Sequence, residues 1–117
     1  MADKMVLEVV FFRTDGGNEP VREWLISMSE EDRKTIGTDI MTVQFRWPLG
    51  MPLVRKMAPG LWEVRSRISD QRIARVMFTV IASEMILIHG FVKKSRVTSA
   101  ADMKVAKDRM KAWKQGG

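Results

Sequence analysis

Residues 61–68 alternate between apolar and polar side chains, and the charged ones have the composition of a phosphate-binding surface. Because side chains two apart on a strand point the same way, we expect Glu63, Arg65 and Arg67 to share one face. Arginine donors neutralise negative charge that develops on phosphoryl oxygens, and a carboxylate accepts the proton of an attacking hydroxyl. The pattern therefore predicts cleavage of a phosphodiester by an adjacent ribose hydroxyl, without a metal ion or other cofactor.

Two later segments carry the remaining basic candidates. A short connection at residues 69–71 predicts a hairpin, which places Arg72 or Arg75 opposite the first strand. The following strand ends in the sequence HGFVKK, residues 89–94. If the three strands are neighbours, one concave surface is ringed by charged side chains: Glu63, Arg65, Arg67, Arg75, Lys93 and Lys94.

Charge is distributed unevenly along the 117 residues, whose formal net charge is +6. Residues 1–54 carry a net charge of −3, whereas residues 55–117 carry +9. Such a field attracts a polyanion, and the phosphate backbone of a nucleic acid is the commonest one in a cell. The chain length predicts a single domain over residues 1–117.

The amino-acid composition excludes several classes of protein. There is no cysteine and only one histidine, which excludes disulfide bonds, thiol catalysis, cysteine-ligated zinc and a two-histidine nuclease. No apolar run approaches the ~20 residues that cross a bilayer, and the first residues do not resemble a signal peptide. We therefore expect a cytoplasmic protein with no membrane partner.

Hydrophobic periodicity predicts the elements that must position these side chains. An apolar strand is expected at residues 5–13, followed by two helices that form a helical hairpin, from Pro20 and from the cap at Ser29 to about Phe45. Strands are expected at residues 61–68, 73–81 and 85–92, and a last helix begins at a Thr98 or Ser99 cap. The fold class is therefore α+β, with an N-terminal strand, a helical hairpin, an antiparallel three- to four-stranded meander and a C-terminal helix.

Three motifs in this order resemble the phage-derived HigB-like branch of the RelE/ParE toxin superfamily. They are GLWEVR at residues 60–65, RIARVMF at 72–78 and IHGFVKK at 88–94, preceded by PVREWL at 20–25. The resemblance implies a RelE-like fold and the toxin of a type II toxin–antitoxin pair. It also implies cleavage of mRNA on the ribosome through in-line attack of the 2′-hydroxyl, and a cognate antitoxin of the helix-turn-helix type.

The resemblance also assigns roles to residues. Arg75 corresponds to the phosphate-clamping arginine, Lys94 to the basic group after the last strand, and Glu63 and Arg65 to catalytic strand positions. Many relatives have a tyrosine near the C-terminus, whereas this chain has no tyrosine, so stacking on a base falls to Phe91 or to an arginine plane. The other expected RNA contacts are Arg67, His89, Lys93 and Arg96.

Two other functions are compatible with the sequence. One is a non-enzymatic toxin of the ParE kind, which shares the fold and inhibits DNA gyrase by binding. The other is a nucleic-acid-binding module. The basic cluster of Lys93, Lys94 and Arg96 favours RNA chemistry over a gyrase-binding tail.

Overall fold

A five-stranded sheet forms the centre of the protein in the computed structural model, which describes residues 4–93 and 97–116. The strands lie in the order β1-β5-β4-β3-β2. Their bounds are β1 Glu8–Phe11, β2 Val54–Ala58, β3 Leu61–Arg67, β4 Ile73–Ile81 and β5 Glu84–Lys93. The helices are α1 Pro20–Ile26, α2 Glu30–Arg46 and α3 Ala100–Gly116, and a short 3-10 helix, η1, spans Ser69–Gln71.

Strands β2 to β5 form an antiparallel meander, and β1 joins it in parallel beside β5. The predicted α+β fold, with its N-terminal strand, consecutive helices and C-terminal helix, is confirmed. Strand β2 was not predicted as an element. It is short, it follows Pro52, and its adjacent Arg55 and Lys56 interrupt the alternation that identifies a strand.

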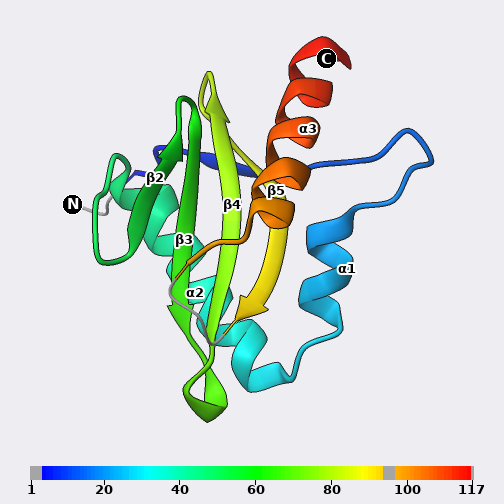
Figure 1. Ribbon diagram of the computed structural model, residues 1–117. Helices are drawn as coiled ribbons and strands as arrows, with labels where there is room; N and C mark the ends of the chain where they lie inside the picture. Colours follow the sequence, from blue (N-terminus) through cyan, green and yellow to red (C-terminus); the bar gives the residue numbers. More distant parts are fainter. Residues whose placement is uncertain (1–3, 94–96, 117) are drawn as a thin grey trace.

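The sheet is covered on both faces, by α1 and α2 on one side and by α3 on the other (Figure 1). Val21 of α1 and Ile36 of α2 are buried with Val64 of β3 on the first face. Ala106 of α3 is buried with Leu61 and Met77 on the second. The alternation predicted for residues 61–68 is thereby confirmed, because Trp62 and Val64 pack toward the two-helix side. No helix in the described ranges is long and apolar enough to cross a membrane.

Both later helices begin at serine caps: Ser29, as the sequence predicts, and Ser99, one of the two residues that the sequence offers for the last helix. The Ser29 hydroxyl accepts a hydrogen bond from the Asp32 amide at 3.1 Å, and the Ser99 hydroxyl accepts one from the Asp102 amide at 3.1 Å. Helix α3 then packs on the sheet through partly buried side chains, Met103, Met110 and Trp113. Flexible methionines at this contact adapt to an irregular surface but fix its position weakly.

Gly90 of β5 is in direct contact with α1. A Cβ atom at this position would lie 2.4 Å from the ring of Trp24, so only glycine lets the helix approach the strand this closely. We expect Gly90→Ala to lower the free energy of unfolding by roughly 1–3 kcal/mol, the usual cost of overpacking a core. Urea denaturation measures this change.

Gly37→Ala is the matched control for this variant. Gly37 lies in α2, and a Cβ atom there would meet no atom within 4 Å. Since alanine favours a helix over glycine by ~1 kcal/mol, this variant should be more stable than the wild type. Equal effects of the two substitutions would contradict the packing argument.

Candidate functional site

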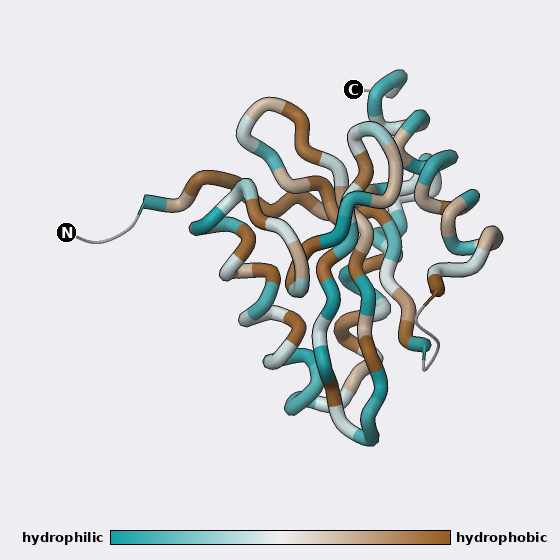
Figure 2. The backbone as a smooth tube through the Cα atoms, turned by 60° about the vertical axis from the view of Figure 1, so that its left-hand side comes forward, coloured by the Kyte–Doolittle hydropathy of each residue, from teal (hydrophilic) through white to brown (hydrophobic). Residues whose placement is uncertain are grey.

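A basic cleft opens at the end of β3, near the tip of the β3–β4 hairpin. It has a volume of about 780 Å³ and contains four guanidinium groups, those of Arg55, Arg65, Arg67 and Arg72. Met51, Ile68, Gln71 and Ile73 complete its lining. The β2–β3 pairing starts at Val54 and Val64, and beyond it the Arg65 amide donates to the Leu53 carbonyl at 2.9 Å, so β3 extends past its neighbour only at Ser66 and Arg67. Figure 2 shows hydrophilic residues at this hairpin tip.

Asp32 of α2 holds the hairpin that carries the cleft. Its carboxylate accepts hydrogen bonds from the Ser69 amide at 3.0 Å, the Ser69 hydroxyl at 3.0 Å and Arg72 Nη2 at 2.9 Å. The bond from the Ser69 amide lowers the pKa of Asp32; burial opposes this, and the Ser69 and Ser29 side chains and Arg72 add to it. The carboxylate therefore stays ionised and keeps Arg72 at the wall of the cleft.

We expect Asp32→Asn to lower the melting temperature by several degrees at pH 7 and by less at pH 3. The pKa of Asp32 is lower in the folded state than in the unfolded chain, so its contribution to stability is present above the unfolded pKa. That contribution disappears as the pH falls through the folded pKa, where the wild-type carboxyl group becomes protonated. Thermal denaturation of both proteins between pH 7 and pH 3 measures this change. A difference in melting temperature that stays constant over this range would contradict the prediction.

Glu63 and Arg75 form a buried pair instead of lining an open surface. Both side chains are 0% exposed, and Arg75 Nη1 lies 3.5 Å from Glu63 Oε1. The Thr98 hydroxyl connects them more closely, since it donates to Glu63 Oε2 at 2.7 Å and accepts from Arg75 Nη1 at 3.0 Å. Burial lowers the pKa of Arg75, and the Glu63 carboxylate opposes this effect.

The expectation that these two residues ring an accessible concave surface is therefore wrong. The register places Arg75 directly between Arg65 and Phe91, in the centre of the sheet, and Thr98 lies over it at the start of α3. Sequence alternation identifies the face on which a side chain lies but not what covers that face. Arg65 has a half-buried position, with Nε 3.9 Å from Glu63 Oε1, and reaches the cleft.

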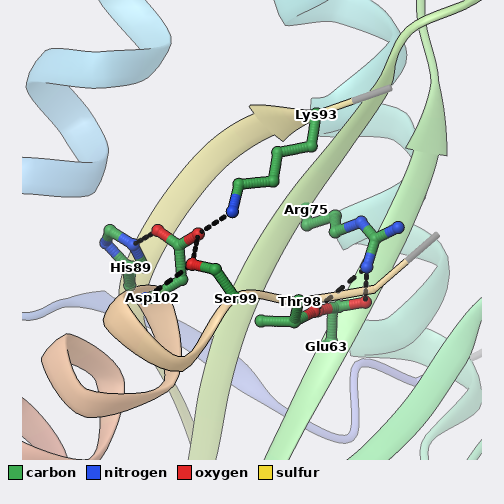
Figure 3. A network of polar contacts seen from close by, with 7 residues as sticks. All are labelled: Glu63, Arg75, His89, Lys93, Thr98, Ser99 and Asp102. Atoms are coloured by element: carbon green, nitrogen blue, oxygen red, sulfur yellow. Dashed lines mark hydrogen bonds and ion pairs between the residues drawn. The ribbon is translucent and has the colours of Figure 1, made fainter. Parts of the chain in front are cut away.

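A second polar cluster surrounds Asp102 in the first turn of α3 (Figure 3). Asp102 Oδ1 lies 2.8 Å from His89 Nε2, and Oδ2 lies 2.7 Å from both Lys93 Nζ and Ser99 Oγ. Burial raises the pKa of Asp102, but hydrogen bonds from His89, Lys93 and Ser99 outweigh burial and lower it to about 2. Asp102 is thus an ionised carboxylate that joins the start of α3 to β5.

The sequence suggested that Phe91 stacks on a base, but the ring of Phe91 is not available for this contact. It is 9% exposed; the His89 ring stacks on it at 5.3 Å between centroids, and Lys93 Nζ lies 5.6 Å from its centroid. The aromatic ring nearest the surface in this cluster is therefore that of His89, which sequence analysis treated as an RNA contact.

The structure brings some of the remaining predicted residues together. Arg67 and Lys93 both pair with Ile73, from opposite sides, so they lie in one row across three strands. Arg67 is exposed at the cleft, and Lys93 belongs to the Asp102 cluster. Lys94 and Arg96 lie outside the described residues.

Three members of these sites, Asp102, Thr98 and Arg55, were not predicted from the sequence. A signal for Asp102 was present in the spacing Ser99-x-x-Asp102, which repeats the Ser29-x-x-Asp32 pattern at the start of α2. Thr98 and Arg55 had no comparable signal. In the described part of the chain, no group of three histidine or carboxylate side chains lies together as a metal site would require.

The fold and the cleft together define a class: a small α+β domain whose mixed sheet carries an arginine-rich cleft at one end. Residues 23–111 match the model of the family described as "Phage derived protein Gp49-like (DUF891)". The match covers most of the chain, and the protein therefore belongs to the phage-derived Gp49-like family. No curated protein matches the sequence.

Proposed function

We propose that this protein is the toxin of a type II toxin–antitoxin pair and acts as a ribosome-dependent mRNA endoribonuclease of the HigB-like kind. Its family is associated with RelE/HigB-like toxins, and its fold is consistent with theirs. The observation that carries the proposal is the cleft with four arginines at the uncovered end of β3. An open, arginine-rich site of this size suits consecutive phosphates of a single strand.

The proposed reaction is an in-line displacement at phosphorus. The 2′-hydroxyl of a ribose gives up its proton to water as its oxygen forms a bond to the adjacent phosphorus, the bond from phosphorus to the 5′-oxygen breaks, and the 5′-oxygen takes up a proton from water. Arg65 and Arg67 neutralise charge on the phosphoryl oxygens from the cleft. Lys93, which pairs with Asp102, ends β5 on the same face of the sheet, and two further basic residues, Lys94 and Arg96, follow it in the sequence. The products are a 2′,3′-cyclic phosphate and a 5′-hydroxyl.

The proposed partners follow from the same charges. The cleft and α3 are basic, so an antitoxin that blocks RNA binding is expected to present acidic side chains to them. Helix α3 exposes four lysines, of which Lys107 and Lys111 suit rRNA phosphates, whereas Lys104 pairs with Asp108 and Lys114 reaches toward Gly60 at the β2–β3 turn. The antitoxin is expected to be of the helix-turn-helix type and encoded beside this chain.

One observation favours a second candidate function. The cleft lining contains arginines, a glutamine and apolar side chains, but no carboxylate or histidine among the described residues. Such a surface could bind without chemistry, as in a non-enzymatic ParE-like toxin that inhibits DNA gyrase.

In vitro translation with the purified chain distinguishes the two functions. Primer extension of the message should reveal cuts that depend on ribosomes, and a parallel supercoiling assay should show uninhibited gyrase. Gyrase inhibition without cuts would favour the ParE-like function. If neither effect occurs, the proposal is contradicted and a nucleic-acid-binding module is left.

A further inference from the structure

A second pocket adjoins the basic cleft and shares two of its arginines. It has a volume of about 500 Å³ and lies beside the end of β3, where α2 passes behind the sheet (Figure 1). Arg65, Arg67 and Ile73 line both hollows, so the cleft and this pocket form one continuous trough. The rest of the lining, from α2 and from the turn before β2, defines the Asp39 pocket: Thr35, Asp39, Pro52 and Leu53.

The two walls of the Asp39 pocket are fixed before any ligand binds. On one wall, the Arg65 amide donates to the Leu53 carbonyl at 2.9 Å, which ties the turn before β2 to β3. On the other wall, α2 is anchored by Ile36 and Ile40, which are buried in the core. The pocket is therefore preformed, as most small-ligand sites are.

Away from the arginines, the side chains of this pocket offer hydrogen-bond acceptors. Thr35 and Asp39 are four residues apart on α2, which makes them neighbours on its surface. The Thr35 hydroxyl donates to the Glu31 carbonyl at 3.2 Å, so its lone pairs are left for a ligand. Asp39 is half-buried, and its carboxylate has no hydrogen bond or ion pair with the residues that the structure describes. An ionised carboxylate accepts hydrogen bonds and donates none.

This chemistry suits a nucleic-acid base and not a phosphate. A carboxylate repels phosphate, whereas Pro52 and Leu53 provide an apolar surface for the flat face of a base. Guanine presents two adjacent donors on its Watson–Crick edge, the N1–H and the 2-amino group, which match the two oxygens of a carboxylate. Adenine, cytosine and uracil each present an acceptor next to their donor on that edge.

We propose that the Asp39 pocket binds the base next to the phosphate that Arg65 and Arg67 hold, and that Asp39 selects guanine there. This inference rests on the proposed function, which supplies the RNA strand. Because the two arginines line both hollows, a nucleotide whose phosphate they bind reaches the Asp39 pocket with its base. Asp39 determines specificity and takes no part in the bond changes.

Asp39→Asn tests this assignment, because it exchanges one acceptor oxygen for a donor with little change in shape. The cut ends of mRNA from in vitro translation are mapped to single nucleotides. At one fixed position beside the cut, we expect the wild type to favour guanosine roughly 10- to 100-fold, the range for a hydrogen bond to a charged group. In Asp39→Asn the preference should move to adenosine, whose acceptor and donor match an asparagine amide. The total cleavage and the melting temperature should change little.

Asp70→Asn is the matched control for charge. Asp70 is exposed at the tip of the β3–β4 hairpin, outside the lining of both hollows. Its φ of 60° is a conformation that asparagine adopts as readily as aspartate. This variant removes the same charge and should keep the preference for guanosine. A change of preference in both variants would show that charge alone governs it and would overturn the inference.

Nucleotide binding by the purified chain provides a measurement that needs neither ribosomes nor cleavage. In NMR titrations, guanosine 5′-monophosphate should bind roughly tenfold more tightly than inosine 5′-monophosphate, which lacks the 2-amino donor. Asp39→Asn should abolish this difference, and Asp70→Asn should retain it.

The outcomes separate this inference from the proposed function. A wild type that makes no cuts but discriminates between the two nucleotides through Asp39 overturns the proposed function and supports guanine binding in the pocket. Cuts without a preference for guanosine, or equal binding of the two nucleotides, overturn this inference while mRNA cleavage stands. Loss of cleavage at every site in a folded Asp39→Asn also overturns it, because the carboxylate would then act in the reaction itself.

Discussion

Arg75→Met is expected to lower the free energy of unfolding by about 3 kcal/mol or more, the scale for breaking one partner of a buried ion pair. Both members of the Glu63–Arg75 pair are 0% exposed, so the substitution leaves a carboxylate in the core. Thr98 still donates to that carboxylate, and Arg65 Nε lies 3.9 Å away, which limits the loss. Urea denaturation with an unchanged slope measures the change.

A double variant identifies the cause of this loss. Glu63→Gln removes the buried charge but keeps an oxygen that can accept from the Thr98 hydroxyl. We therefore expect Glu63→Gln/Arg75→Met to be more stable than Arg75→Met alone, a strongly non-additive result. If the double variant loses as much free energy of unfolding as the two single variants together, the two residues do not interact. The buried pair would then not account for the instability of Arg75→Met.

This prediction depends on a fact that sequence analysis could not provide. Alternation over residues 61–68 correctly assigned each side chain to a face, because strand geometry depends on local spacing alone. That face is covered by Thr98 and α3, which contact β3 only in the folded structure. Thr98 and its partner Glu63 are 35 residues apart along the chain. Arg67 reaches the cleft because β2 begins only at Val54, opposite Val64, and the weak pattern of β2 did not predict where it begins.

The helix caps show how much local information the sequence held. The sequence predicts caps at Ser29 and at Thr98 or Ser99, and in the structure Ser29 and Ser99 each accept a hydrogen bond from the amide three residues later. The aspartates at those positions do more than a capping box requires, since their carboxylates reach across to the sheet. Asp32 binds Ser69 and Arg72, whereas Asp102 binds His89 and Lys93. The spacing predicts the start of each helix, but only the packed structure determines which partners each aspartate reaches, the β3–β4 connection for Asp32 and β5 for Asp102.

We expect the basic cleft to act in mRNA cleavage and the exposed side of α3 to act in ribosome binding. Two variants that each remove two positive charges distinguish these roles. Arg55→Gln/Arg67→Gln removes two exposed charges from the cleft, whereas Lys107→Gln/Lys111→Gln removes two from the exposed side of α3. Lys104 is left in place because it lies 2.7 Å from Asp108, which already offsets its charge. If net charge alone governed activity, both variants would lose the same amount.

We expect the cleft variant to lower the rate of mRNA cleavage roughly 100-fold, the scale for removing groups that stabilise charge in the transition state. The α3 variant should retain the cleavage rate of bound complexes but bind ribosomes more weakly. Its slope of log affinity against log salt should fall by about 1.4, because each lost phosphate contact on a single strand contributes about 0.7. Single-turnover cleavage and ribosome co-sedimentation at several salt concentrations measure the two effects. Equal losses of cleavage in both variants would show that α3 belongs to the same RNA-binding surface as the cleft, because the two surfaces would then contact the reacting strand together.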